Sequence, residues 1–267
     1  LILDNAEVIC RVAPAVIFYN VYECGQPDAA AGASVLLADG SNNRIVGSHV
    51  AKIYKPGTDE KLHKYDGAFY SRMSMKLDGA GKLRIEADNE GLDSEMHLTI
   101  DGGEISIESG NDGINTNEDG VSVTTINGGS LHIIAGLGAE GDGIDSNGYL
   151  VINGGTVIAT GNMLDHFEAA QTSVLFTFNG RQAGGQTYAL KQGDKTILTA
   201  TPANGFQYLI LSSAELTEGV YQLYQGDLQL AGVASGMREP MGGGMQPPEG
   251  MEKPENIQPP AGMTPPE

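Results

Sequence analysis

The sequence is poor in residues that would cross-link a small fold or place it in a membrane. It contains no tryptophan and only two cysteines, Cys10 and Cys24. Two cysteines are too few for a disulfide framework, so they either form one bridge or stay as thiols. No stretch reaches the roughly 18 apolar residues of a membrane span. Residues 1–8 already resemble a strand, so we expect no signal peptide but a mature or trimmed chain.

Positive charge is also scarce. The 267 residues include 34 acidic and 15 basic side chains, which gives a formal net charge of −19. Such a chain repels nucleic acid and anionic membranes, and it suits cations or a partner that cations bridge. Residues 85–180 contain 16 acidic residues and neither lysine nor arginine. Salt bridges within this stretch therefore cannot neutralise its carboxylates.

A repeated six-residue phrase occupies the middle of the chain. It occurs as NEGLDS at 89–94, NDGINT at 111–116 and GDGIDS at 141–146. Before, between and after the phrases lie stretches of period-two alternation around a glycine turn, which indicates strands. These strand-like stretches span 75–85, 97–107, 123–133 and 149–159. A unit of this length cannot bury its apolar face alone, so the copies must stack. The repeat predicts an all-β, right-handed parallel β-helix.

The pattern changes toward the end of the chain. Residues 166–231 contain hairpin-like strands and turn residues, which predicts a small antiparallel cap on the β-helix of residues 1–165. Residues 232–267 are rich in Pro, Gly and Met without periodicity, so we expect a disordered tail. Residues 47–64 are predicted to form an excursion from one of the coils.

The stacked phrases predict a metal site. Equivalent positions of neighbouring coils lie about 4.8 Å apart, and carboxylates at that spacing repel by roughly 3 kcal/mol per pair at an effective dielectric of about 20. Oxygen donors from adjacent coils suit a hard cation such as calcium. The absence of Cys and His from the columns disfavours zinc and copper. The predicted ligands are Glu90, Asp112 and Asp142 in one column and Asp93, Asn115 and Asp145 in a second.

Asp, Asn and Gly are also the usual residues of β-turns, so the phrases have an alternative explanation as turns alone. Asp101, Asn127 and Asn153 precede the glycine corners and lack a second oxygen donor three residues later. For these three residues we predict a hydrogen-bonded ladder that binds no metal.

The run from KYDGAFYS at 64–71 to GDGIDSNGYLVINGG at 141–155 resembles the carbohydrate-binding domain-containing proteins of secreted bacterial origin. The likeness covers about residues 1–230, with phrase, glycine corner and cap in the family's order. It implies a parallel β-helix that is similar in fold to calcium-dependent pectate lyases. It further implies that calcium binds at the six positions above. It also implies an extracellular or cell-surface protein that binds acidic plant polysaccharide, such as polygalacturonate or pectin, and also cellulose. Phe69 or Tyr70 stands where an acid of the pattern would sit.

Three functions are compatible with these features. We favour non-catalytic, calcium-dependent binding of acidic polysaccharide by a monomer, with calcium as the bridge between protein and uronate carboxylates. The second is a calcium-dependent polysaccharide lyase, which needs a base near the metal. That base would be Lys64, Lys76, Lys82 or Arg84, because residues 85–180 offer none. The third is a structural cell-surface adhesin.

The predicted carbohydrate contacts come from the few basic residues near the coils. Lys64, Lys82 and Arg84 would pair with uronate carboxylates. Tyr65 and Tyr70 lie among them in the sequence and would stack on sugar rings. The alternative is a solvated loop with ordinary packing aromatics.

Overall fold

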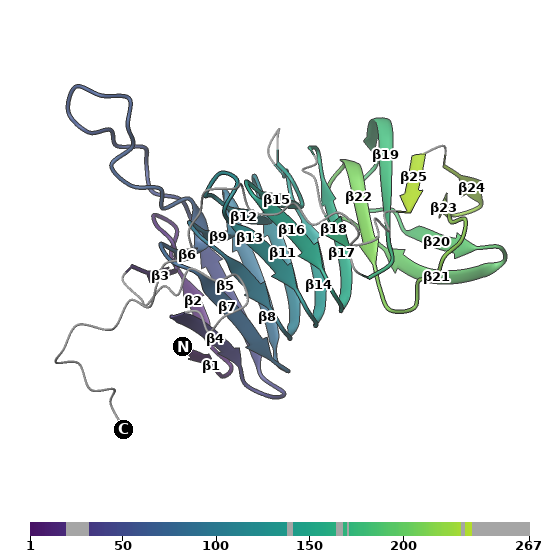
Figure 1. Ribbon diagram of the computed structural model, residues 1–267, viewed down its shortest axis with the longest axis horizontal. Helices are drawn as coiled ribbons and strands as arrows, with labels where there is room; N and C mark the ends of the chain where they lie inside the picture. Colours follow the sequence, from purple (N-terminus) through teal and green to yellow (C-terminus); the bar gives the residue numbers. More distant parts are fainter. Residues whose placement is uncertain (20–31, 138–140, 164–167, 170, 231–232, 237–267) are drawn as a thin grey trace, which may run out of the picture.

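The computed structural model describes residues 1–19, 32–137, 141–163, 168–169, 171–230 and 233–236. The regular elements among them are all strands, so the predicted all-β class is confirmed. Figure 1 shows a stack of coils that starts at the N-terminus and meets a smaller cap at its other end. In the described part of the chain, no helix has the length and hydropathy needed to cross a membrane.

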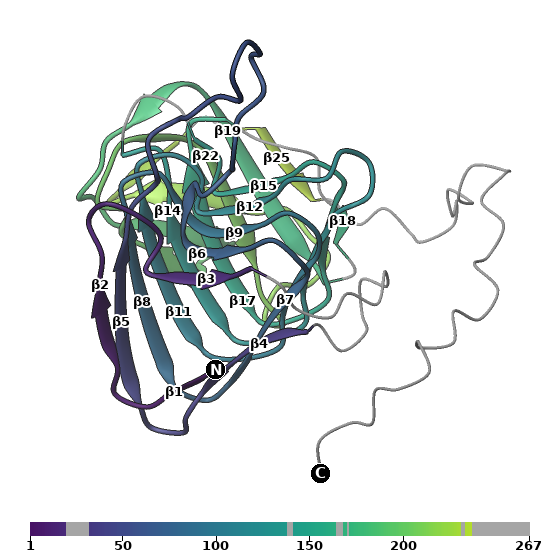
Figure 2. The ribbon, with the colours of Figure 1, turned by 90° about the vertical axis from the view of Figure 1, so that its left-hand side faces the viewer.

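Three sheets form the sides of the stack, as the view from the N-terminal end in Figure 2 shows. Sheet A contains β1 (Ile2–Leu3), β4 (Ala33–Leu37), β7 (Met75–Gly79), β10 (Leu98–Ile100), β13 (Val123–Ile126), β16 (Tyr149–Ile152) and β18 (Glu168–Ala169). Sheet B begins with β2 (Glu7–Ile9), β5 (Asn42–Gly47), β8 (Lys82–Ala87), β11 (Glu104–Ser109), β14 (Ser130–Ile134) and β17 (Thr156–Gly161). Sheet C contains β3 (Val16–Phe18), β6 (Gly67–Ser71), β9 (Glu90–Ser94), β12 (Ile114–Thr116) and β15 (Ile144–Ser146).

The inner faces of the three sheets enclose one continuous core. Buried and exposed residues alternate along β4, because successive side chains of a strand point to opposite faces. The register keeps equivalent apolar residues together from coil to coil: Leu83, Ile105 and Leu131 pair in order, and each is only 1% exposed. The predicted parallel β-helix is therefore confirmed.

Glycines form the corner between sheets A and B. Gly103, Gly129 and Gly155 have positive φ angles of 93°, 83° and 79°, a conformation that favours glycine. The corners also stack tightly, because a Cβ added at Gly129 would lie 2.6 Å from the Gly103 carbonyl oxygen. Backbone conformation and close packing thus both require glycine here.

A polar ladder follows the same corner on the outside. Asn153 Nδ2 donates to Asn127 Oδ1, and Asn127 Nδ2 donates to Asp101 Oδ1, each over 2.8 Å. Lys76 forms an ion pair with Asp101 at the end of the ladder. These contacts confirm the predicted ladder and give Asp101 a cationic partner from the protein itself.

The C-terminal strands cover the last coil. Strand β22 (Phe206–Ser212) runs antiparallel to β17 and extends sheet B, followed by β19 (Ser173–Gln182) and β25 (Val233–Gly236). A separate antiparallel sheet contains β21 (Lys195–Ala200), β20 (Tyr188–Gln192), β23 (Gln222–Gln225) and β24 (Leu228–Gln229). A second apolar cluster lies around Phe176, Tyr188 and Phe206. The predicted antiparallel cap is confirmed.

Two boundaries differ from the sequence-based division. Sheet B continues from the β-helix into the cap, so the two units share one sheet across residue 165. Strand β25 pairs with β19 beyond the predicted end of the cap at residue 231. The rest of the predicted tail, residues 237–267, lies outside the described residues, and so does Cys24. Cys10 is half-buried.

Between β5 (Asn42–Gly47) and β6 (Gly67–Ser71) the chain leaves the stack as a long arm, residues 49–66, two residues later than the predicted excursion of residues 47–64. Its two sides run beside each other, because Val50 N donates to Tyr65 O over 2.9 Å and Leu62 N donates to Ile53 O over 2.7 Å. Figures 1 and 2 show the arm projecting away from the coils near the N-terminal end of the stack.

Candidate acidic site on sheet C

Sheet C aligns the three phrases along one side of the β-helix. Asn115 pairs in register with Asp93 on one neighbouring strand and with Asp145 on the other. The first column is aligned by the backbone, because Gly91 N donates to Asp112 O and Gly113 N donates to Asp142 O, each over 3.0 Å. The two predicted columns therefore exist as columns of neighbouring residues.

The glycine of each phrase has a packing role. A Cβ added at Gly91 would lie 2.4 Å from Ile107 Cγ2, and one added at Gly113 would lie 2.1 Å from Ile133 Cγ2. Both isoleucines belong to the core strands of sheet B. Glycine is therefore needed at these positions because sheets B and C approach each other closely. The acid that precedes each glycine is thereby held at the edge of this junction.

Glu90, Asp93 and Asn115 form the most buried part of the site, with exposed fractions of 6%, 0% and 7%. Asn115 Nδ2 donates to Glu90 Oε1 over 3.1 Å. Asn117 Nδ2 donates to Asp93 Oδ1. The other acceptor atoms, Glu90 Oε2, Asp93 Oδ2 and Asn115 Oδ1, are buried without a hydrogen-bond partner among the described residues. Buried acceptors normally have partners, and here either a proton shared by the Glu90 and Asp93 carboxyls or a bound cation would supply one.

The electrostatics of the cluster are unfavourable for two bare carboxylates. Burial raises the pKa of Glu90 to about 8, and the charge of Asp112 adds to the effect. Burial also raises the pKa of Asp93 well above its usual range, with a further contribution from Glu90. Either a proton or a bound cation would relieve this repulsion. At neutral pH the two alternatives compete for the same oxygens.

Asp112 is better satisfied than Glu90. Its Oδ1 accepts a 2.7 Å hydrogen bond from the backbone N of Asp142, and its Oδ2 accepts a 3.1 Å bond from Asn111 Nδ2. Burial raises its pKa, and the bond from Asp142 opposes that shift. Asp142 is 8% exposed and Asp145 is half-buried. The strongest unmet demand for a positive charge thus lies at Glu90 and Asp93.

The donor set at this cluster fits a hard cation. Its three unpartnered atoms are all oxygens, two from carboxylates and one from an amide, and they come from two neighbouring coils. Calcium takes such ligands and completes its shell with carbonyls or water. No group of three or more His, Cys, Asp or Glu side chains in the described residues is arranged to hold a metal ion. A cation here would therefore need ligands besides carboxylates, such as the Asn115 amide, backbone carbonyls or water.

Three of the predicted sugar contacts lie together beside this cluster. Tyr70 pairs in register with Asp93, and its hydroxyl donates to Glu95 Oε1 over 2.9 Å. Lys64 Nζ lies 3.4 Å from Glu95 Oε2. Tyr65 contacts Tyr70 edge to face, with a centroid distance of 4.9 Å. Tyr70 is only 3% exposed, so its ring faces are occupied by protein and offer no platform for a sugar.

The other two predicted contacts lie on a different sheet. Lys82 and Arg84 belong to β8 of sheet B, and both are paired with acidic residues of the same sheet. Lys82 Nζ lies 2.7 Å from Glu104 Oε2, and Arg84 contacts Glu86 and Glu108 at 2.9 Å and 3.1 Å. The structure therefore separates the predicted basic cluster into two parts.

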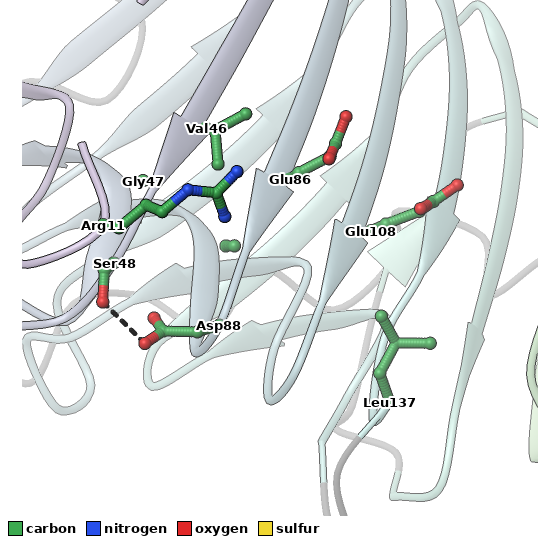
Figure 3. A pocket seen from close by; sticks show the side chains of 9 residues that line it. Arg11, Val46, Gly47, Ser48, Glu86, Asp88, Glu108 and Leu137 are labelled. Carbon is green, nitrogen blue, oxygen red and sulfur yellow. Dashed lines mark hydrogen bonds between the residues drawn. The ribbon is translucent and has the colours of Figure 1, made fainter. Parts of the chain in front are cut away.

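A hollow on sheet B was not predicted from the sequence. It has a volume of about 340 Å³, and Figure 3 shows Arg11 and Asp88 beside it. Ser48 Oγ donates to Asp88 Oδ2 over 2.6 Å, and His49 N donates to Asp88 Oδ1 over 3.0 Å. Burial opposes ionisation of Asp88, but these bonds outweigh it and lower the pKa of the carboxyl. The lining residues are scattered over five coils, so no local motif signals the hollow.

The fold and the columns of sheet C define a parallel β-helix protein with a buried acidic site on one side. The chain belongs to the carbohydrate-binding domain-containing protein family, whose model matches residues 1–218. This match confirms the resemblance noted in the sequence, and it implies a carbohydrate ligand. No curated protein and no solved structure matches the chain.

Proposed function

We propose that this protein binds an acidic polysaccharide without cleaving it, and that calcium on sheet C is part of the binding site. Family membership supports the carbohydrate. The observation that carries the calcium is the set of buried, unpartnered oxygens of Glu90, Asp93 and Asn115. Bound calcium would supply the positive charge that these residues lack and would attract carboxylates of the ligand.

Glu90, Asp93 and Asn115 would hold the ion most directly. Asp112, Asp142 and Asp145 continue the two columns and would act as further ligands or as a second site toward the cap. Hydrogen bonds within the protein preorganise the site, because Asn117 orients Asp93 and the amide of Asn115 orients Glu90. Each acid thus directs one oxygen toward a protein donor and leaves one for the ion.

The charge of the chain favours a bridged complex. A protein with a formal charge of −19 repels a polyuronate at long range. Attachment therefore needs a cation between the two sets of carboxylates, or a local group of positive side chains. A glycan such as polygalacturonate carries one carboxylate on each sugar and suits both contacts.

The positions of the basic residues favour binding over lyase chemistry. A lyase needs a base close to the metal, but Lys76 lies on sheet A and Lys82 and Arg84 lie on sheet B. All three are paired with acidic side chains. Lys64 is the candidate near sheet C, and it lies beside Glu95.

A direct test measures retention of the whole chain on immobilised polygalacturonate, in calcium and in an excess of chelator. We expect retention in calcium and its loss in chelator, with no release of product that absorbs in the ultraviolet. Retention that is equal in both solutions would reject the calcium bridge. Release of unsaturated uronate, lost in Lys64→Ala, would establish the lyase instead. Failure to bind any acidic polysaccharide would leave the adhesin hypothesis as the better one, and an extracellular location is part of either proposal.

A further inference from the structure

The arm of residues 49–66 exposes apolar side chains that the fold does not need. Ile53, Tyr54 and Leu62 are 51%, 49% and 56% exposed. They are held in an ordered setting, because Leu62 N donates to Ile53 O and Tyr54 forms a β-bridge with Lys61. Exposed apolar side chains that are held in order on a projecting element suit contact with a partner.

The arm also concentrates positive charge in an acidic protein. Four of the 15 basic residues of the chain lie within positions 52–64, and they are Lys52, Lys55, Lys61 and Lys64. Lys55 pairs with Glu60, whereas Lys61 and Lys64 lie 3.4 Å from Asp66 and Glu95. The Lys55–Glu60 pair is exposed, so it is weak and another carboxylate can replace Glu60.

The base of the arm touches the acidic site. The Asp66 carbonyl oxygen accepts hydrogen bonds from Glu90 N and Asn89 Nδ2, each over 3.2 Å. The Asp66 carboxylate is the one that Lys61 approaches, and it is close enough to contribute to the raised pKa of Glu90. A ligand bound at Glu90 would therefore lie close to the base of the arm, which projects from the stack (Figure 1).

We propose that the arm is the element that grips the polysaccharide chain beyond the metal site. Tyr54 would pack against the apolar face of a sugar ring, and Lys52 would pair with a uronate carboxylate. The combination of exposed aromatic and lysine side chains matches an acidic sugar polymer, which has apolar ring faces and regularly spaced negative charges. The inference rests on the proposed function, because the acidic glycan is the same ligand.

The test compares the variants Tyr54→Ala and Lys52→Ala with controls from other parts of the surface. Tyr149 is 40% exposed on sheet A, and Lys195 is exposed at the start of β21 in the cap. Tyr149→Ala and Lys195→Ala therefore remove the same groups at similar exposure, away from the arm. Affinity for oligogalacturonate of fixed length is measured by calorimetry in calcium, at low and at raised ionic strength.

We expect each arm variant to lose affinity, on the order of tenfold for Tyr54→Ala, as for other anchoring aromatic residues. Lys52→Ala should also weaken the dependence on salt, because one screened charge pair is lost. Both controls should bind like the parent protein. If both arm variants bind with the affinity of the parent protein, the proposed role of the arm is wrong. The proposed function would stand in that case, because the parent protein still binds the glycan. Absence of binding by the parent would overturn the proposed function and, with it, the partner assigned to the arm.

Discussion

Asn115 donates a hydrogen bond from its side-chain amide to Glu90, which lies 25 positions earlier and on the neighbouring coil. Because the amide nitrogen points to Glu90, the amide oxygen is left buried and without a donor among the described residues. In this orientation the amide adds a third buried oxygen without a donor to those of Glu90 and Asp93, so it favours a bound cation. The predictions on stability below follow from this arrangement.

Calcium should stabilise the fold. A ligand that binds only the folded state adds about 2.7 kcal/mol at a free concentration of 100 times its dissociation constant. We expect a higher melting temperature in calcium than in chelator, and loss of most of that gain in Asp93→Asn or Asp112→Ala. The exposed Asp119 lies away from the columns, so Asp119→Asn should keep the full gain. Equal melting temperatures of the parent protein in calcium and chelator would mean that the phrases are turns alone.

Stability without calcium should fall as pH rises. In the unfolded chain Glu90 ionises near its ordinary value of 4.5, whereas the folded protein keeps its proton up to about pH 8. The folded state therefore binds more protons between these values, and its stability decreases through that window. The loss should reach the order of a few kcal/mol. Urea unfolding in chelator at pH 5 and pH 8 measures it.

The variant Glu90→Gln is the control for this pH dependence. It cannot ionise, so the part of the slope that Glu90 contributes should disappear. A parent protein whose stability is constant between pH 5 and pH 8 in chelator would contradict the burial of an unpartnered carboxylate at this position.

Gly91→Ala should destabilise the protein by about 1–3 kcal/mol, because the new methyl group overpacks the junction of sheets B and C. Its Cβ would lie 2.4 Å from Ile107 Cγ2 and 2.5 Å from the Gly113 carbonyl oxygen. Gly180→Ala is the matched control, since no atom lies within 4 Å of the Cβ there. Chemical denaturation of both variants would decide the question, and equal stability would contradict the close approach.

Lys82→Ala should leave polysaccharide binding unchanged. Lys82 lies on sheet B, whereas the acidic site lies on sheet C, and Lys82 pairs with Glu104 at the surface. The loss of one exposed pair should change the free energy of unfolding by about 0–1 kcal/mol. Retention on polygalacturonate is the measurement, with Lys64→Ala beside it because Lys64 lies near sheet C. A marked loss of binding in Lys82→Ala would place the glycan on sheet B.

The repeat made most of the fold predictable. Each phrase and each glycine corner returns after one turn of the chain, so the register of Asp93, Asn115 and Asp145 follows from their positions alone. The ladder of Asp101, Asn127 and Asn153 was predictable for the same reason. When repeats stack, equivalent residues of successive repeats become neighbours in space, so the sequence pattern predicts which residues are in contact.

The grouping of the basic residues was not predictable in the same way. Lys64 and Lys82 are close in sequence, but Lys64 lies in the arm just before β6 of sheet C, whereas Lys82 begins β8 of sheet B. The burial of Tyr70 was also missed, because it depends on Tyr65 and Glu95 covering the outside of sheet C. A strand pattern shows which side chains point away from the core, but it does not show what covers them.

The junction between β17 and β22 closes the C-terminal end of the β-helix to further coils of the same kind. Every earlier neighbour in sheet B is parallel, and here the direction reverses. A further coil of the same kind would need a parallel edge to continue from, and β22 removes that edge. Duplication of a phrase-bearing unit could therefore lengthen the β-helix by insertion between existing coils, but not by addition at this end. New acidic positions would then arise within the columns, next to old ones, and the spacing between neighbouring sites would stay the same.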